Sequence, residues 1–136
     1  MRVAPIAIVA AIVLTAAGGS DRVTLRPFAG AWSGHTRSLV VNRAGVAKES
    51  ISDGCCDRVI RLTTRLSLPR RVGNSIVATA TVVRARIFDR SAFGKRAPPR
   101  VGDRGRFTLR RGIIDEGLTQ TIYCDARTSR LGRCGA

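Results

Sequence analysis

The chain has 136 residues, and its 24 Lys and Arg residues against 9 Asp and Glu residues give a formal net charge of +15. This length supplies one hydrophobic core and excludes a two-domain enzyme. Of the 24 basic residues, only Lys48 and Lys95 are lysines. The excess charge predicts attraction to polyanions. An arginine-rich composition also arises from GC-rich coding sequence, so charge by itself names no partner.

The N-terminal residues have the layout of a secretory signal peptide. Arg2 precedes an apolar run from Val3 to Ala17, and small residues follow from Gly18 to Ser20. The run is about 15 residues long, whereas a helix needs roughly 20 to cross a bilayer. We therefore predict a signal peptide at residues 1–20, a single domain at residues 21–136, a secreted or extracytoplasmic location, and no integral membrane segment in the mature chain.

After residue 20 the chain alternates short apolar or β-branched runs with Gly and Pro turn signals. The predicted strands, in chain order, are 28–34, 37–42, 46–52, 59–68, 75–88, 107–109, 113–114 and 118–124. From Val59 to Leu68 the apolar residues fall at every second position, as on one face of a strand. Pro69 to Asn74 predicts the end of this strand and the start of a hairpin.

Two further segments complete the predicted fold. The run from Ser75 to Phe88 is long for one strand, so we expect a bend or bulge within it. Periodicity is lost from Asp89 to Arg104, which is predicted to be an irregular loop. No helix is predicted after the signal peptide. The fold class is therefore all-β: a small antiparallel barrel or sandwich of about 7–8 strands, linked by disulfides.

The chain contains four cysteines, Cys55, Cys56, Cys124 and Cys134. An even number in an exported domain predicts two disulfides. Neighbouring cysteines on extended backbone project to opposite sides. We therefore expect Cys55 and Cys56 to bond separately to Cys124 and Cys134, in either order. A metal site and a redox pair are disfavoured because no Cys-x-x-Cys spacing occurs.

Residue types that support catalysis are sparse. His35 is the single histidine, and a hydrolase would need it as a general base. No Gly-x-Ser-x-Gly elbow accompanies it, because the nearest segment runs Gly30-Ala31-Trp32-Ser33-Gly34. No carboxylate pair is marked as an acid and base couple, and no phosphate or dinucleotide motif occurs. We predict no enzymatic activity, no cofactor and no metal.

Arginines recur on the polar faces of three predicted strands. If these strands are neighbours, the arginines form a basic patch. Aromatic residues that could stack on bases are scattered, so no specific nucleic acid is expected. The expected partners are anionic cell-envelope polymers or lipids. The candidate contacts are Arg61, Arg65, Arg84, Arg86, Arg106 and Arg110.

Two resemblances follow from short segments. Gly30-x-Trp32 resembles the opening strand of lipocalin-type and avidin-type barrels, in which such a Trp closes one barrel end. Six further segments span most of the mature chain: Gly34–Arg37, Asp53–Cys56, Asp89–Phe93, Pro98–Gly105, Tyr123–Asp125 and Cys134–Ala136. They resemble segments of an uncharacterised family of small secreted actinobacterial proteins. This resemblance implies export and a disulfide-bonded β fold, and it implies no activity.

Together these observations predict a secreted, non-catalytic binding module or cell-envelope-associated module. Two alternatives stay open. One is a small hydrolase that uses His35. The other is a secreted protease inhibitor that presents the loop from Asp89 to Arg104. A cavity enclosed by the strands would favour a small ligand, and an arginine-rich outer face would favour a surface partner.

Overall fold

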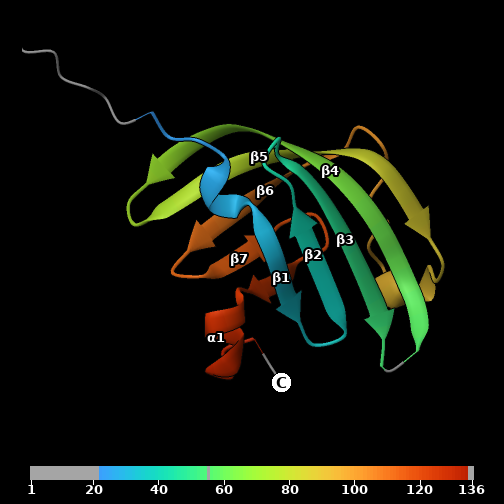
Figure 1. The fold of residues 1–136 in the computed structure, drawn as a ribbon. Helices are drawn as coiled ribbons and strands as arrows, with labels where there is room; N and C mark the ends of the chain where they lie inside the picture. Colours follow the sequence, from blue (N-terminus) through green and yellow to red (C-terminus); the bar gives the residue numbers. More distant parts are fainter. Residues whose placement is uncertain (1–21, 55, 135–136) are drawn as a thin grey trace, which may run out of the picture.

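The computed structural model describes residues 22–54 and 56–134, so the predicted signal peptide lies outside the described residues. The eight strands form one closed antiparallel barrel, in which each strand pairs with its neighbours in the chain and the last pairs with the first (Figure 1). The all-β prediction is confirmed, with the barrel as the correct arrangement. The strands are β1 (Gly30–Gly34), β2 (Arg37–Val41), β3 (Val46–Asp53), β4 (Asp57–Val72), β5 (Ser75–Ile87), β6 (Arg104–Arg110), β7 (Ile113–Glu116) and β8 (Thr121–Cys124).

The interior is filled by apolar side chains that alternate along each strand. The larger cluster includes Phe28, Trp32, Leu39, Phe107 and Tyr123, all buried. Phe28 belongs to a 3₁₀ turn, η1 (Arg26–Phe28), which precedes β1. The indole Nε1 of Trp32 donates to the carbonyl oxygen of Phe28 at 2.8 Å, which joins this turn to the barrel. Each large apolar side chain contributes about 1.5–3 kcal/mol by burial.

The two ends of the barrel differ in their connections. Because successive strands are antiparallel, the β1–β2, β3–β4, β5–β6 and β7–β8 connections lie at one end, which we call the mouth. The β5–β6 connection, residues 88–103, is the longest and contains a second 3₁₀ turn, η2 (Ser91–Phe93). The predicted irregular loop from Asp89 to Arg104 therefore forms part of the mouth, except that Arg104 begins β6.

The long hairpin of β4 and β5 departs from the predicted boundaries. The expected irregularity in β5 is present, because Thr63 pairs with Arg84 while Thr64 pairs with Val82. β4 continues past Pro69 to Val72, so the predicted end at Leu68 is wrong, whereas the predicted hairpin turn is present at Gly73 and Asn74. The ladder instead skips two residues between Ser67 and Arg70 and resumes as far as Val72. A local irregularity thus accommodates the proline, which lacks a backbone donor, without ending the strand.

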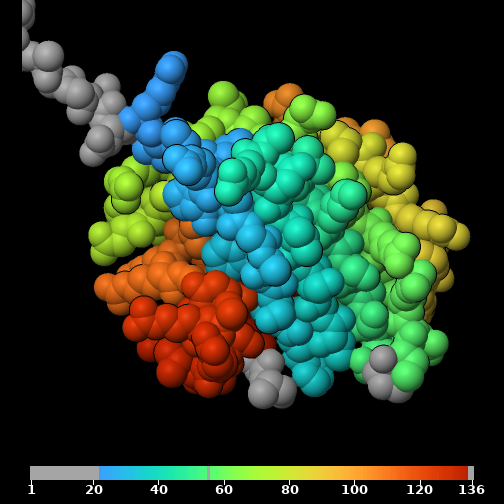
Figure 2. Space-filling model, viewed as in Figure 1, coloured from blue at the N-terminus to red at the C-terminus, as the bar shows by residue number. Residues whose placement is uncertain are grey.

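The C-terminal region contains an α-helix that was not predicted from the sequence. It is α1 (Ala126–Arg130), and the Asp125 carboxylate caps its N-terminus by accepting from the Thr128 amide at 2.7 Å. The predicted strand 118–124 is shorter, because residues 118–120 form a turn and β8 begins at Thr121. Figure 2 shows this C-terminal region, in red, against the blue surface of β1. Among the described residues, no helix combines the length and apolar character needed to cross a bilayer.

The predicted disulfide connectivity is wrong. Cys124 is bonded to Cys134, with their Cα atoms 5.9 Å apart. Cys56 is also disulfide-bonded, and neither of these two is its partner, since they pair with each other. The reason is α1, which turns the tail back toward the end of β8. The expectation for Cys55 lies outside the described residues.

Candidate functional site

The outer surface of β2 to β5 carries two rows of residues that lie side by side across the strands. The first row is Ser38, Ser50, Arg61 and Arg86, and the second is Val40, Lys48, Thr63 and Arg84. The four cations, Lys48, Arg61, Arg84 and Arg86, are all exposed, and we call them the basic face. Neither row contains a carboxylate. Register therefore concentrates positive charge on one side of the barrel.

Arg61 and Arg86 lie directly opposite each other in the β4–β5 ladder. Like charges in this position destabilise a sheet by a few tenths of a kcal/mol to about 1 kcal/mol. The guanidinium of Arg86 also lies over the Phe88 ring, 4.9 Å from its centroid, which restricts where it can move. A bound anion would neutralise the repulsion between the two arginines.

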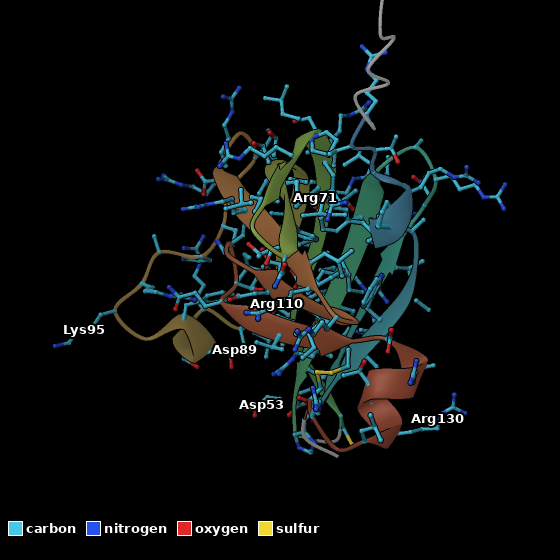
Figure 3. The ribbon with its side chains drawn as sticks, turned by 90° about the vertical axis from the view of Figure 1, so that its left-hand side faces the viewer. Asp53, Arg71, Asp89, Lys95, Arg110 and Arg130 are labelled. Atoms are coloured by element: carbon cyan, nitrogen blue, oxygen red, sulfur yellow. A yellow bond between two sulfur atoms is a disulfide. The ribbon has the colours of Figure 1, made fainter. Side chains whose placement is uncertain are left out.

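The other three predicted arginines, Arg65, Arg106 and Arg110, are exposed and lie outside the two rows. Arg65 lies opposite Thr81, whose other neighbour is Arg104, and Arg106 lies opposite Thr79. Arg110 ends β6, away from the two rows (Figure 3). The structure thus brings three of the six predicted arginines into the basic face and adds Lys48. Lys48 was detectable, because it alternates with inward-facing residues of β3.

A groove of about 430 Å³ crosses the basic face. Its lining includes Lys48 and Arg61, the hydroxyl-bearing side chains Ser38, Ser50 and Thr63, and also Val40, Leu62 and the largely buried Glu49. Cationic and hydroxyl donors placed together suit an oxyanion such as a phosphate, because charge-assisted hydrogen bonds are the strongest that side chains make with such groups. The groove is therefore a candidate seat for an anionic group.

The chain has only two glutamates, Glu49 and Glu116, and both lie in the barrel interior. Glu49 is 5% exposed on β3 and Glu116 is 0% exposed at the end of β7. Neither residue was predicted from the sequence to belong to a site. A signal was present for Glu49, because it stands between Ala47 and Ile51 at the inward-facing period of its strand.

A hydroxyl network joins the two carboxyl groups. Glu49 Oε1 lies 2.5 Å from the Tyr123 hydroxyl, 2.9 Å from Thr119 Oγ1 and 3.1 Å from Thr121 Oγ1. Thr119 Oγ1 also contacts Glu116 Oε2 and lies 2.8 Å from Thr121 Oγ1. Five oxygen–oxygen contacts are thus served by three hydroxyl protons. The network has fewer protons than contacts.

Burial shifts the ionisation of the network. It raises the pKa of the Glu49 carboxyl from the ordinary 4.5 to about 7, and the negative charge of Glu116 adds to the increase. Burial, followed by the charge of Glu49, also raises the pKa of Tyr123 above its usual range, so the phenol stays protonated as a donor. A proton that stays on Glu49 supplies one of the protons that the oxygen–oxygen contacts lack. Glu49 Oε2 and Thr64 Oγ1 are buried and have no hydrogen-bond partner among the described residues.

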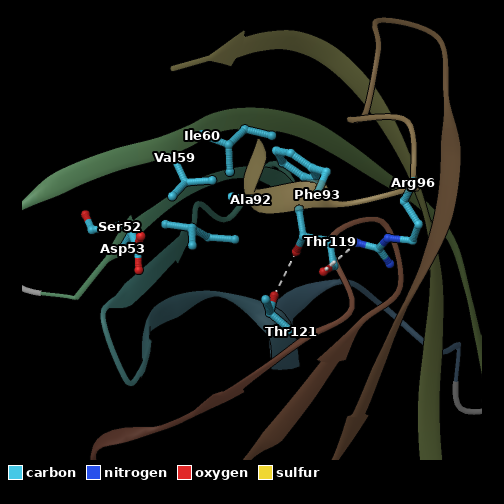
Figure 4. Close-up of a pocket in the computed structure, with 10 residues that line it drawn as sticks. Ser52, Asp53, Val59, Ile60, Ala92, Phe93, Arg96, Thr119 and Thr121 are labelled. Carbon is cyan, nitrogen blue, oxygen red and sulfur yellow. Dashed lines mark hydrogen bonds between the residues drawn. The ribbon is translucent and has the colours of Figure 1, made fainter. Parts of the chain in front are cut away.

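A cavity of about 330 Å³, which we call the mouth cavity, opens beside this network (Figure 4). Ile51, Val59, Ile60 and Phe93 form its apolar side. Thr119 and Thr121 form a polar side, and both are bonded to Glu49. Asp53 and Arg96 also line it, and the Arg96 guanidinium donates to the carbonyl oxygen of Thr119 at 3.4 Å.

The residues of the two alternative functions are placed as follows. His35 is exposed in the β1–β2 connection. The loop from Asp89 to Arg104 is tied down by its own carboxylates: Asp89 accepts from the Ser91 amide at 2.9 Å, and Asp103 accepts from the Arg100 amide at 2.8 Å. Phe93 of this loop packs against the smaller core cluster. This loop therefore forms a wall of the mouth cavity.

Comparison of the chain with protein-family models, with curated proteins and with solved structures gives no match in any of the three.

Proposed function

We propose that this chain is an exported, non-catalytic binding module that docks through the basic face on a phosphate-bearing anionic polymer of the cell envelope. The observation that carries the proposal is the direct pairing of Arg61 with Arg86, within two rows that hold four cations and no carboxylate. A polyanion that neutralises this pair removes a repulsion that the free protein bears, and the relief adds to the free energy of binding.

The composition of the groove favours a polymer over a bilayer surface. Its hydroxyls and cations offer donors to successive oxyanions along a chain. Val40 is the only apolar side chain in the two rows. Proteins that bind membrane surfaces strongly add apolar side chains that enter the acyl region. The basic face offers charge and hydrogen bonds instead.

Two observations support an extracytoplasmic site of action. The N-terminal residues have the layout of a signal peptide. The Cys124–Cys134 disulfide is a bond that persists in oxidising compartments. Export would bring the basic face into contact with the anionic polymers of the envelope.

The test compares the binding of fluorescently labelled inorganic polyphosphate to the wild-type protein and to the double variant Arg61→Gln, Arg86→Gln. We expect the variant to bind about tenfold or more weakly at low salt, because two cations of the face are lost. We also expect a shallower dependence of the affinity on salt, because fewer counterions are released from the polymer.

The matched control is the double variant Arg71→Gln, Arg130→Gln. Both residues are exposed and lie outside the two rows, and the change removes the same charge (Figure 3). Equal losses in the two variants would show that net charge alone attracts the polymer and would contradict the proposal. Tighter binding to phosphatidylglycerol vesicles than to polyphosphate would identify a lipid surface as the partner instead.

A further inference from the structure

The mouth cavity combines an apolar side with hydroxyl oxygens whose protons are already engaged. Its volume of about 330 Å³ is near the lower end of the range for small-molecule sites. Ile51, Val59, Ile60 and Phe93 offer an apolar surface to a short hydrocarbon body. This cavity lies inside the barrel end, whereas the basic face lies on the outer surface.

The polar side of the cavity is rich in acceptors and short of donors. The Thr119 and Thr121 hydroxyls are bonded to Glu49 Oε1, and Thr119 also contacts the carboxyl of Glu116. Thr119 Oγ1 has three oxygen neighbours, which take up its proton and both lone pairs, whereas Thr121 Oγ1 has two neighbours and keeps one lone pair for a ligand. Glu49 Oε2, also buried, has no hydrogen-bond partner among the described residues. A ligand that brings protons complements Thr121 Oγ1, whereas a ligand that brings only acceptors meets a single donor group, the Arg96 guanidinium, which already donates to the Thr119 carbonyl oxygen.

The charged groups around the cavity favour a cationic head. The two glutamates lie behind the threonines, and Asp53 lines the cavity. Arg96 is the opposing cation, but its guanidinium is directed to the Thr119 carbonyl oxygen. The Arg37 guanidinium lies 6.0 Å from the centroid of the Tyr123 ring, and its Nε donates to the carbonyl oxygen of Ile122 at 3.0 Å. Each arginine is oriented toward a backbone carbonyl, and Arg96 keeps its positive charge opposite the three acidic groups.

We propose that the mouth cavity binds a small amphiphilic molecule whose short apolar body lies against Ile51, Ile60 and Phe93 and whose ammonium head donates a hydrogen bond to Thr121, beside the Thr119 hydroxyl. The negative charge of the glutamate pair stabilises the bound cation through these hydroxyls. This site is independent of the basic face, so each can be lost without the other.

The test uses three probes with the same six-carbon body: hexylammonium, hexan-1-ol and hexanoate. Binding is followed by the shifts of the amide NMR signals of Phe93, Thr119 and Thr121 in the full mature chain. We expect hexylammonium to bind about tenfold or more tightly than hexanoate, with the alcohol between them. The free energy of one hydrogen bond to a charged group corresponds to more than a tenfold change in affinity. Hexylammonium should also bind more tightly as the pH rises through about 7, where Glu49 releases its proton.

Two variants separate the head from the body of the ligand. Thr121→Val keeps the shape of the side chain and removes the hydroxyl, so it should reduce the preference for hexylammonium and leave hexan-1-ol binding within about twofold. Phe93→Ala should weaken all three probes, because it removes part of the apolar wall. Equal or tighter binding of hexanoate would overturn the proposal, as would the absence of shifts at these three amides with every probe. A preference for hexylammonium that survives in Thr121→Val would overturn the role of the threonines.

Discussion

The carboxyl groups of Glu49 and Glu116 reach the same hydroxyl, Oγ1 of Thr119. They come from β3 and β7, which are not neighbours in the barrel. Thr119 stands in the connection between β7 and β8, so the mouth holds both acids at a single hydroxyl. One proton cannot serve two carboxylates, and the charge of Glu116 adds to the burial that raises the pKa of Glu49.

Glu49→Gln should change the pH dependence of stability. The folded pKa of Glu49, about 7, lies above the ordinary 4.5, so between these values the native state binds more protons than the unfolded state. Stability from this group is complete below about pH 4.5 and is lost as the pH rises through about 7, by up to about 3 kcal/mol.

Urea unfolding from pH 4 to pH 8, followed by Trp32 fluorescence, should show this decline in the wild type and a flatter curve in the variant. The exposed residue Asp115 supplies the control, because Asp115→Asn should keep the wild-type decline. Parallel curves for wild type and Glu49→Gln would contradict the assignment.

Arg61→Gln should stabilise the free protein. It removes a like-charged pair across the β4–β5 ladder, which contributes a destabilisation of about 0.2–1 kcal/mol at low salt. Arg86→Gln should gain less, because it also loses the contact with the Phe88 ring. Chemical unfolding of both single variants and of the double variant measures the coupling. The gain should shrink in about 0.5 M salt through screening. A loss of stability in Arg61→Gln at low salt would show that the pair is not repulsive.

Non-reducing tryptic mapping should find the C-terminal disulfide as a separate unit. Cleavage after Arg111, Arg127 and Arg133 leaves Cys124 and Cys134 on two peptides, 112–127 and 134–136, which should be recovered as one linked species. The peptide 49–58, which carries Cys56, should be recovered without a link to either. Reduction before digestion provides the control, since it should release both C-terminal peptides. A species that joins peptide 49–58 to Cys124 or Cys134 would contradict the structure.

Gly112→Ala should destabilise the protein more than Gly73→Ala. Both glycines have positive φ, 75° and 56°, so both variants carry the same class of backbone strain. A Cβ at residue 112 would lie 2.4 Å from Thr128 Oγ1 and 2.5 Å from Asp125 Oδ2, whereas no atom lies within 4 Å at residue 73. The difference between the two free energies of unfolding measures the packing of α1 against the β6–β7 turn, and we expect about 1–3 kcal/mol for this overpacking. Equal losses in the free energy of unfolding of the two variants would show that α1 can shift away from residue 112 without loss of stability.

The features of the candidate sites that could be predicted from the sequence depend on patterns along a single strand. Arg61 and Arg65 could be placed on one face of a strand from their spacing, because side chains alternate with period two. The partner of Arg61 could not be named, because register depends on bulges such as that between Thr63 and Thr64, which shift one strand against the other. The failed disulfide prediction considered only the two neighbouring cysteines, Cys55 and Cys56, and could not foresee that the short helix after Asp125 returns Cys134 to Cys124 at the end of β8.

The sequence by itself determined that the chain is built from strands with alternating side chains, and it determined which residues can point outward, because both properties depend only on neighbours along the chain. Closure of the barrel was decided by tertiary structure, through the pairing of Ser33 in β1 with Cys124 in β8. Closure also brought Glu49 and Glu116 to Thr119, and the register of β3, β4 and β5 placed Lys48, Arg61, Arg84 and Arg86 on one outer surface. Contacts between residues distant in the chain depend on register and on the path of the connections, which no local pattern specifies.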